Sequence, residues 1–174
     1  MTELDYRTAH ADEWAQWRDL RLEMLEDEPI AFLQTLDDAL ATPDDVWRRR
    51  HADRIAAPDV MVSLVAVASD GRWRGHAMAQ VDRFSTPRRC WLGAVYVGPE
   101  VRGSGVADRL VELAEHWALD QGFDRLLLEV HEHNARAIAF YLRRGYELTG
   151  EARPYPLNPD ARELEMVKHF AGRG

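Results

Sequence analysis

The chain has 174 residues, of which 46% are hydrophobic and 30% are charged, so it is expected to form one globular domain over residues 1–174. Its one cysteine, Cys90, excludes an internal disulfide and any zinc site built from several cysteines. The 30 acidic residues outnumber the 22 basic ones, which argues against a nucleic-acid-binding face. No apolar run approaches the roughly 20 residues that cross a membrane, and the first residues lack the pattern of a secretory signal. We therefore expect a cytoplasmic protein that binds neither nucleic acid nor a membrane.

The first third of the chain predicts one strand and two helices. Apolar and charged residues alternate over 2–8, which favours a strand. A helix is expected over 13–28 with Asp12 as its N-cap. A second helix is expected over 43–55, with Thr42 as its N-cap and proline at its first position.

The rest of the chain alternates strands with helices. Strands are expected over 60–68, 75–82, 90–97, 125–131, 146–149 and 163–170. Helices are expected over 105–121 and 135–144, with Asn134 capping the second and Gly122 and Gly145 just beyond the two helix ends. This order predicts an α/β fold around one mixed sheet.

A glycine-rich turn joins the strand at 90–97 to the helix at 105–121. Its sequence over 102–107 is Arg-Gly-Ser-Gly-Val-Ala. Glycines let backbone amides approach a ligand, and a helix N-terminus attracts anions, so the segment suits a phosphate or pyrophosphate. An ordinary strand-to-helix turn is the alternative. A nucleotide P-loop would need a lysine that is absent, and the dinucleotide fingerprint would need a glycine where Asp108 stands.

Two blocks resemble the GNAT superfamily of acetyl-coenzyme A-dependent N-acetyltransferases. Residues 102–107 are similar to its pyrophosphate loop, Arg/Gln-x-x-Gly-x-Gly/Ala. Residues 128–146 look like its second signature, in which a strand is followed by asparagine, a helix carrying tyrosine, then glycine and an aromatic residue. The resemblance implies a GNAT fold, with a single mixed, mostly antiparallel, twisted sheet, helices on both faces and a splayed central strand pair.

The resemblance also implies which residues bind coenzyme A. Backbone groups of Val95, Tyr96 and Val97 would bond the pantetheine arm as an added strand would. The pyrophosphate loop would comprise Arg102, Gly103, Ser104, Gly105, Val106, Ala107 and Asp108. Asn134 would bond the pantetheine arm while it caps its helix.

Two catalytic candidates follow from the proton transfers that amine acetylation needs. Tyr141 would lie near the thioester sulfur and act as the acid, and its alternative is a half-buried helix aromatic. Many relatives carry an acidic residue on the strand before the loop, but residues 91–94 contain none. Glu129, on the adjoining expected strand, is our candidate base, and a water chain or a purely structural role is the alternative.

Other residues suggest weaker hypotheses. His131 and His133 share a strand face but lack further ligands, so no metal is expected. Glu163 and Glu165 could line a cavity for a cationic acceptor, although an exposed strand edge is the plainer interpretation. Segments that shape the acceptor pocket in the family contain Phe32, Trp47 and Tyr155, for which core packing is the plainer explanation.

The sequence thus predicts an N-acetyltransferase that uses acetyl-coenzyme A as co-substrate and no metal. The acceptor would be a small amine or peptide that attacks directly in a ternary complex, and the net charge of −8 is compatible with a cationic one. A homodimer is compatible with such a fold. The alternatives are another acyl donor or acceptor, and a non-catalytic coenzyme A-binding sensor of the same fold.

Overall fold

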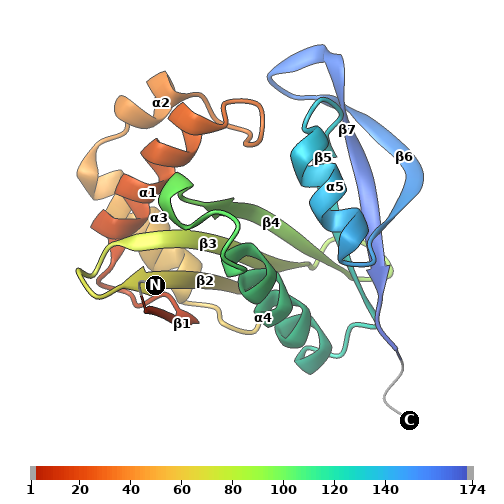
Figure 1. The fold of residues 1–174 in the computed structure, drawn as a ribbon, viewed down its shortest axis with the longest axis horizontal. Helices are drawn as coiled ribbons and strands as arrows, with labels where there is room; N and C mark the ends of the chain where they lie inside the picture. Colours follow the sequence, from red (N-terminus) through yellow and green to blue (C-terminus); the bar gives the residue numbers. More distant parts are fainter. Residues whose placement is uncertain (1–2, 172–174) are drawn as a thin grey trace.

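The computed structural model describes residues 3–171 as one seven-stranded sheet covered by helices (Figure 1). The elements in chain order are β1 (Leu4–Thr8), α1 (Trp14–Asp27), α2 (Leu36–Leu40), α3 (Asp44–Ile55), β2 (Met61–Ala68), β3 (Trp73–Asp82), β4 (Arg89–Val97), a 3₁₀ turn (Pro99–Val101), α4 (Val106–Asp120), β5 (Arg125–His131), α5 (Ala135–Arg143), β6 (Glu147–Tyr155) and β7 (Asn158–His169). No helix in this range is long and apolar enough to cross a membrane.

The sheet has the strand order β1-β2-β3-β4-β5-β7-β6. Every neighbouring pair is antiparallel except β4 and β5, which are parallel and are connected by α4. The mixed, mostly antiparallel sheet confirms the predicted fold class.

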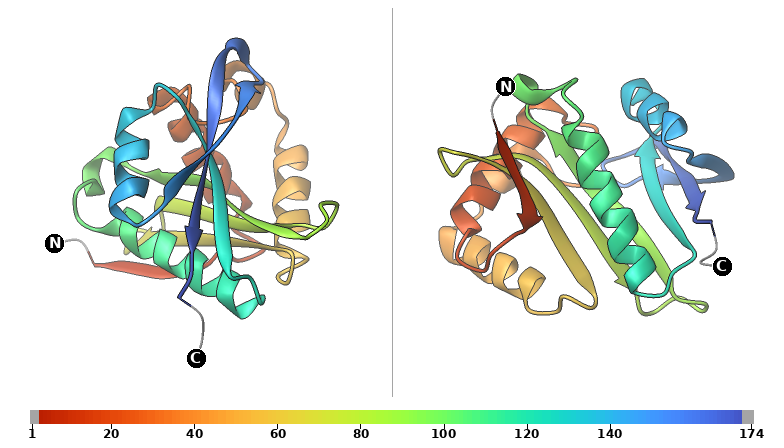
Figure 2. Two further views of the ribbon diagram at one scale, coloured as in Figure 1. Left: turned by 90° about the vertical axis from the view of Figure 1, so that its right-hand side faces the viewer. Right: turned by 60° about the horizontal axis from the view of Figure 1, so that its bottom comes forward.

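Two apolar cores cover the two faces of the sheet. One core joins the sheet to α4 and α5 and contains the fully buried Leu110, Leu128 and Met166. The other core joins the sheet to α1, α2 and α3 and contains Trp17 and Trp47. Helices therefore lie on both faces, as expected, with α4 crossing one face diagonally (Figure 2).

The β6–β7 hairpin folds back toward the connection between α1 and α2. The Tyr155 hydroxyl donates a hydrogen bond of 3.1 Å to the main-chain oxygen of Phe32. This hydrogen bond holds the end of the hairpin against the segment between α1 and α2, and the two lie close together in the left view of Figure 2.

Two of the predicted N-caps are wrong. The residue before α1 is Glu13, and its carboxylate accepts hydrogen bonds from Arg7 and from the His10 amide instead of capping the helix. Helix α3 begins at Asp44, so its N-cap is Pro43. The Thr42 hydroxyl donates instead to the main-chain oxygen of Asp38 at 2.8 Å. The third predicted cap is confirmed, since the Asn134 side chain accepts from Ala137 N–H at the start of α5.

Candidate active site

The central strands β4 and β5 separate soon after they meet. Only Trp91 with Leu127 and Leu92 with Leu128 are paired between them. Ala94 then takes a positive φ of 50°, and the register between β3 and β4 shifts at the same place. Beyond this bulge, the β4 edge that faces β5 is left without a strand partner. Apart from the Val97 oxygen, to which Arg102 donates, its backbone groups are open to a ligand that adds as a strand. The structure confirms the predicted splay.

The glycine-rich turn delivers the N-terminus of α4 to the open end of β4. Gly103 and Gly105 have φ of 75° and 85°, and within residues 3–171 a Cβ on either would meet no protein atom closer than 4 Å. No side chain among the described residues caps α4, and its first hydrogen bond runs from Arg109 N–H to the Gly105 oxygen. The amides of the first helical turn are therefore free to bind an anion.

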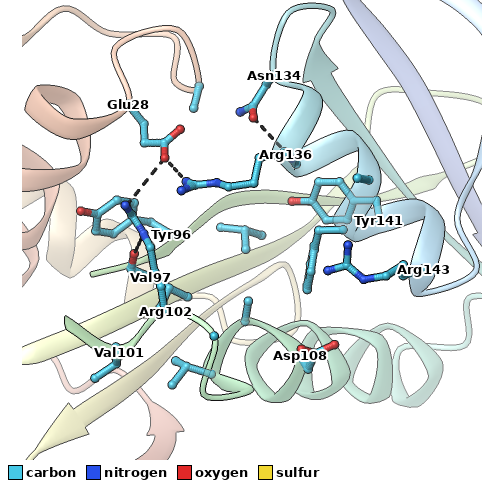
Figure 3. Close-up of a pocket in the computed structure, with 18 of the residues that line it drawn as sticks. Glu28, Tyr96, Val97, Val101, Arg102, Asp108, Asn134, Arg136, Tyr141 and Arg143 are labelled. Carbon is cyan, nitrogen blue, oxygen red and sulfur yellow. Dashed lines mark hydrogen bonds and ion pairs between the residues drawn. The ribbon is translucent and has the colours of Figure 1, made fainter. Parts of the chain in front are cut away.

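Helix α5 forms the opposite wall. Asn134 at its N-cap and Tyr141, two turns later, both line the space between α4 and α5. Tyr141 is buried, its ring packs against Phe140 and Tyr146, and burial raises the pKa of its hydroxyl. The hydroxyl points into the cavity (Figure 3). Because its pKa is raised, the hydroxyl keeps its proton at neutral pH.

These walls enclose a cavity of about 540 Å³. The predicted residues that line it are Val95, Tyr96, Val97, Arg102, Gly103, Gly105, Val106, Ala107, Asp108, Asn134 and Tyr141. Ser104 does not line it, and the Ser104 hydroxyl donates to the Val101 oxygen instead at 2.6 Å. The structure thus gathers nearly all of the predicted coenzyme-binding residues around one space.

Charged side chains bridge the mouth of this cavity. Glu28, just after α1, accepts from Arg136 of α5 and lies 3.7 Å from Arg102 Nη2 (Figure 3). Arg102 also pairs with Asp27 and donates from Nε to the Val97 oxygen at 3.0 Å. The pair of Glu28 and Arg136 was not predicted, because two residues so far apart in the chain carry no local signal.

Asp108 is the one predicted loop residue whose charge opposes an anion. It lies in the first turn of α4, where Arg144 donates to its Oδ1 at 3.1 Å. Arg143 also lines the cavity. Arg136 and Arg143 are seven residues apart on α5, which places them on one helix face and could have pointed to them.

Glu129 does not line the cavity. Its neighbours Leu128 and Val130 belong to the core beneath α4 and α5, so Glu129 faces the other side of the sheet. There it pairs with Glu165 in register and lies 3.6 Å from Arg153 Nε. Whether it acts as a base stays a prediction.

The acidic residues around Glu129 are not on an exposed edge. Strand β7 lies between β5 and β6, and Glu165 is buried. Burial and the Glu129 carboxylate raise the pKa of Glu163, against the opposing effect of Arg153. The expectation of an exposed edge for Glu163 and Glu165 is therefore wrong.

The remaining candidates are divided between packing and a second cavity. His131 packs edge-on against Tyr155 at a centroid distance of 4.7 Å, and its Nδ1 accepts from the His133 amide. Within residues 3–171, no group of three or more His, Cys, Asp or Glu residues is placed to hold a metal ion. Phe32 lines the main cavity, and Trp47 lines a separate smaller one.

Comparisons with known proteins agree with this geometry. The model of the acetyltransferase (GNAT) family matches residues 11–146. The peptidyl-lysine N-acetyltransferase YjaB of Salmonella typhimurium is 36% identical over 72 residues, which cover 38% of this chain and 46% of that protein. The L-amino acid N-acetyltransferase AaaT of Escherichia coli is 28% identical over 151 residues, which cover 82% of this chain and 86% of the relative.

Solved structures show the same fold. The PaiA N-acetyltransferase of Thermoplasma acidophilum, solved in complex with coenzyme A, has a TM-score of 0.76 at 14% identity, with 97% of this chain and 99% of that chain covered. By contrast, this chain spans about half the length of the YjaB proteins that it matches.

Proposed function

The chain belongs to the acetyltransferase (GNAT) family, and we propose that it transfers the acetyl group of acetyl-coenzyme A to a primary amine. One observation carries this proposal. The open edge of β4, the uncapped N-terminus of α4 and the buried Tyr141 hydroxyl all border a single cavity.

The residues of the cavity suit coenzyme A. The unpaired edge at Val95–Val97 can bond the amides of the pantetheine arm, and the free amides after Gly105 can hold the pyrophosphate. Asn134 offers its amide nitrogen in addition to the oxygen that caps α5. When bound, acetyl-coenzyme A supplies an acyl group activated as a thioester.

Tyr141 is the proposed acid. Its raised pKa keeps the O–H intact, so the hydroxyl can hydrogen-bond a sulfur on which negative charge develops. Direct attack by the amine is supported by Cys90, the chain's only cysteine, which is fully buried. Burial raises the pKa of its thiol to about 12, so it is a poor nucleophile at neutral pH.

Glu129 remains the proposed base, acting from the far side of the splayed strands. The cavity and Glu129 lie on opposite faces of the sheet, and β4 and β5 are unpaired between them beyond Leu92 and Leu128. An acceptor that enters from the Glu129 face would meet the thioester where the two strands part. A water chain that leads to Glu129 is the alternative. The expected cytoplasmic location and homodimer likewise stay predictions.

The relatives differ in what they acetylate. Their names describe peptidyl-lysine, aminoglycoside and L-amino acid acetyltransferases. Family membership therefore supports a primary amine acceptor without choosing among these classes.

A thiol-release assay tests the proposal. Purified protein is incubated with acetyl-coenzyme A and a panel of polyamines, aminoglycosides, amino acids and lysine peptides, and free thiol is measured. We expect amine-dependent release with at least one class. Tight coenzyme A binding by calorimetry without any amine-dependent release would contradict the proposal and favour the sensor alternative.

A further inference from the structure

A second cavity lies on the opposite face of the sheet from α4. It has a volume of about 200 Å³ and is bounded by α1, α3 and strands β3 and β4. Its lining residues are Trp17, Arg21, Met24, Gln34, Trp47, Arg50, Arg54, His76, Met78 and Ala94. Three of these are arginines, and none is acidic.

Arg21 and Arg54, the two inner arginines, are less exposed than Arg50. Neither has a carboxylate partner within residues 3–171. Arg21 donates from Nε to Gln34 at 3.1 Å and stacks over Phe32 at 5.0 Å. Arg54 stacks over Trp17 at 4.7 Å, and its buried Nε has no hydrogen-bond partner among the described residues. Partly buried cations that contact only amides, rings and sulfur are costly to maintain.

This arrangement is unusual for the chain. Acidic residues outnumber basic ones by 30 to 22, and Arg18, one turn before Arg21 on α1, pairs with both Asp19 and Asp44. Burial, together with repulsion from Arg54, lowers the pKa of Arg21 to about 10. Both side chains nevertheless stay charged at neutral pH, so the cavity holds positive charge that nothing in the described protein neutralises.

His76 adds a vacant acceptor to the same cavity. Its Nδ1 lies 3.0 Å from the Ala94 oxygen, and since a carbonyl can only accept, Nδ1 carries the proton. Burial, with Arg54, Arg21 and His51 nearby, lowers the pKa of His76 to about 3, so the ring is neutral. Its buried Nε2 then carries a lone pair that can accept a hydrogen bond, and no described residue donates to it.

The small cavity lies beside the place where the thioester is proposed to lie. Ala94 lines the small cavity, and the next residue, Val95, lines the large one. A ligand in the small cavity would therefore reach β4 at its bulge, on the face from which an acceptor would approach.

We infer that the small cavity binds the acidic group of the acceptor, so that the substrate is an amine that also carries a carboxylate or a phosphonate. Arg21 and Arg54 would hold the acidic group through charge-assisted hydrogen bonds, and His76 Nε2 would accept a hydrogen bond from the ammonium group or from a water bound to it. This inference rests on the proposed acetyltransferase function and names its substrate class.

Matched pairs of amines test the substrate class. Thiol release is compared for L-amino acids against the corresponding L-amino acid amides, and for aminoalkylphosphonates against simple alkylamines. The amine of an amino acid amide is less basic and is more often unprotonated, so intrinsic reactivity favours the amide. We expect the enzyme to reverse this order by at least about tenfold in kcat/KM, in line with charge-assisted hydrogen bonding. The pair with the larger ratio distinguishes carboxylate from phosphonate.

Variants locate the effect. Arg21→Gln and Arg54→Gln should each abolish most of the preference through KM, while Arg49→Gln, an exposed arginine on α3, should retain it. Because Arg54 has no charged partner, Arg54→Gln should also unfold at an equal or higher urea concentration than wild type. Equal use of acids and amides by the wild type, or a preference that survives both inner substitutions, would overturn the inference.

Binding separates this inference from the proposed function. Coenzyme A binding is measured by calorimetry, and amino acid binding by the fluorescence of Trp17 and Trp47 in the cavity wall. If no amine is acetylated, the proposed function fails, and a fluorescence change with amino acids that Arg54→Gln abolishes still supports an acid-binding cavity. If amines are acetylated and no such change occurs, the cavity assignment fails alone.

Discussion

At the scale of single residues, the site depends on how burial changes side-chain chemistry. Burial raises the pKa of both Tyr141 and Cys90, but the two consequences differ. A protonated phenol can donate a hydrogen bond, whereas a protonated buried thiol cannot attack. The same physical effect thus supports a donor role for Tyr141 and argues against a covalent intermediate on Cys90.

Tyr141→Phe tests the donor. A thiol pKa lies near 8.5, below that of the buried phenol, so in the proposed reaction Tyr141 would stabilise a thiolate mainly by hydrogen bonding. Loss of one such donor costs about 10²-fold in kcat, with coenzyme A affinity unchanged by calorimetry. Tyr146→Phe is the matched control, because the Tyr146 hydroxyl donates a hydrogen bond of 3.2 Å to Glu115 and Tyr146 does not line the cavity. That control should lose about 1 kcal/mol of stability and keep kcat. Equal kcat values in Tyr141→Phe and wild type would reduce Tyr141 to a packing residue.

Glu129→Gln tests the base. If Glu129 takes the proton of the amine, kcat/KM rises with pH in the wild type, and this ascending limb disappears in the variant. If the amine instead loses its proton to water, the limb follows the basicity of the acceptor and shifts between two amines of different pKa. The measurement is a pH profile for both proteins with both amines. An ascending limb that is the same in both proteins would rule out Glu129.

At the scale of elements, the turn between β4 and α4 forms the proposed anion site. Gly105 at the start of α4 and Gly122 after its end share a φ of 85°, and at both a Cβ would meet no atom of the described residues within 4 Å. A side chain at either position pays the same left-handed backbone strain, about 1–2 kcal/mol. Only Gly105 faces the space proposed for the pyrophosphate.

Substitution of these two glycines therefore separates strain from ligand contact. Gly105→Val should reduce coenzyme A affinity at least about tenfold, because the Cβ and its methyl groups would occupy the approach to the free amides. Gly122→Val should lose similar stability and bind coenzyme A normally. Calorimetry and urea unfolding on both variants provide the comparison. Equal coenzyme A affinities in the two variants would refute the proposed pyrophosphate site.

The local pattern predicted those elements whose apolar periodicity is strong. Strand β5 has the expected bounds, α4 is one residue shorter than expected at each end, and α5 is one residue shorter at its C-terminal end. Strands β6 and β7 are longer than expected, because nearly all of β6 is exposed and carries no alternation to detect. The short helix α2 was missed, since its Thr35 cap precedes only five helical residues.

Site residues could be predicted only where they lie within one contiguous sequence motif. Gly103, Gly105 and Asn134 lie in contiguous motifs, and the structure brings them to one cavity. The contacts of Glu28 with Arg136, and of Arg54 with Trp17, join segments that only the fold brings together. No spacing rule along the chain could have identified them.

At the scale of the whole molecule, the two cores place charge differently. On the face toward α4, the buried Glu115 pairs with Arg144 and Lys168. The face toward α1 and α3 buries His76 and, at the edge of its core, Glu13. Glu13 joins β1, α1 and β3 by accepting from Arg7, the His10 amide and Trp73 Nε1. Burial opposes its charge, but these hydrogen bonds outweigh burial and lower the pKa of Glu13 to about 2. Acid should therefore destabilise the fold through this second face.

The pH dependence of unfolding separates the two groups. The pKa of His76 is about 3 in the folded protein against 6.5 for free histidine, so between these values only the unfolded chain binds the proton. The stability that His76 contributes is complete above pH 6.5 and is lost as pH falls toward 3, at no more than about 1.4 kcal/mol per pH unit. Glu13 adds its loss only below its ordinary pKa of 4.5. Urea unfolding at pH 7, 6 and 5 should therefore show a decline that His76→Gln flattens and that His116→Gln, on the exposed side of α4, leaves in place. A decline of the same slope in His76→Gln would mean that His76 is not the group that senses mild acid.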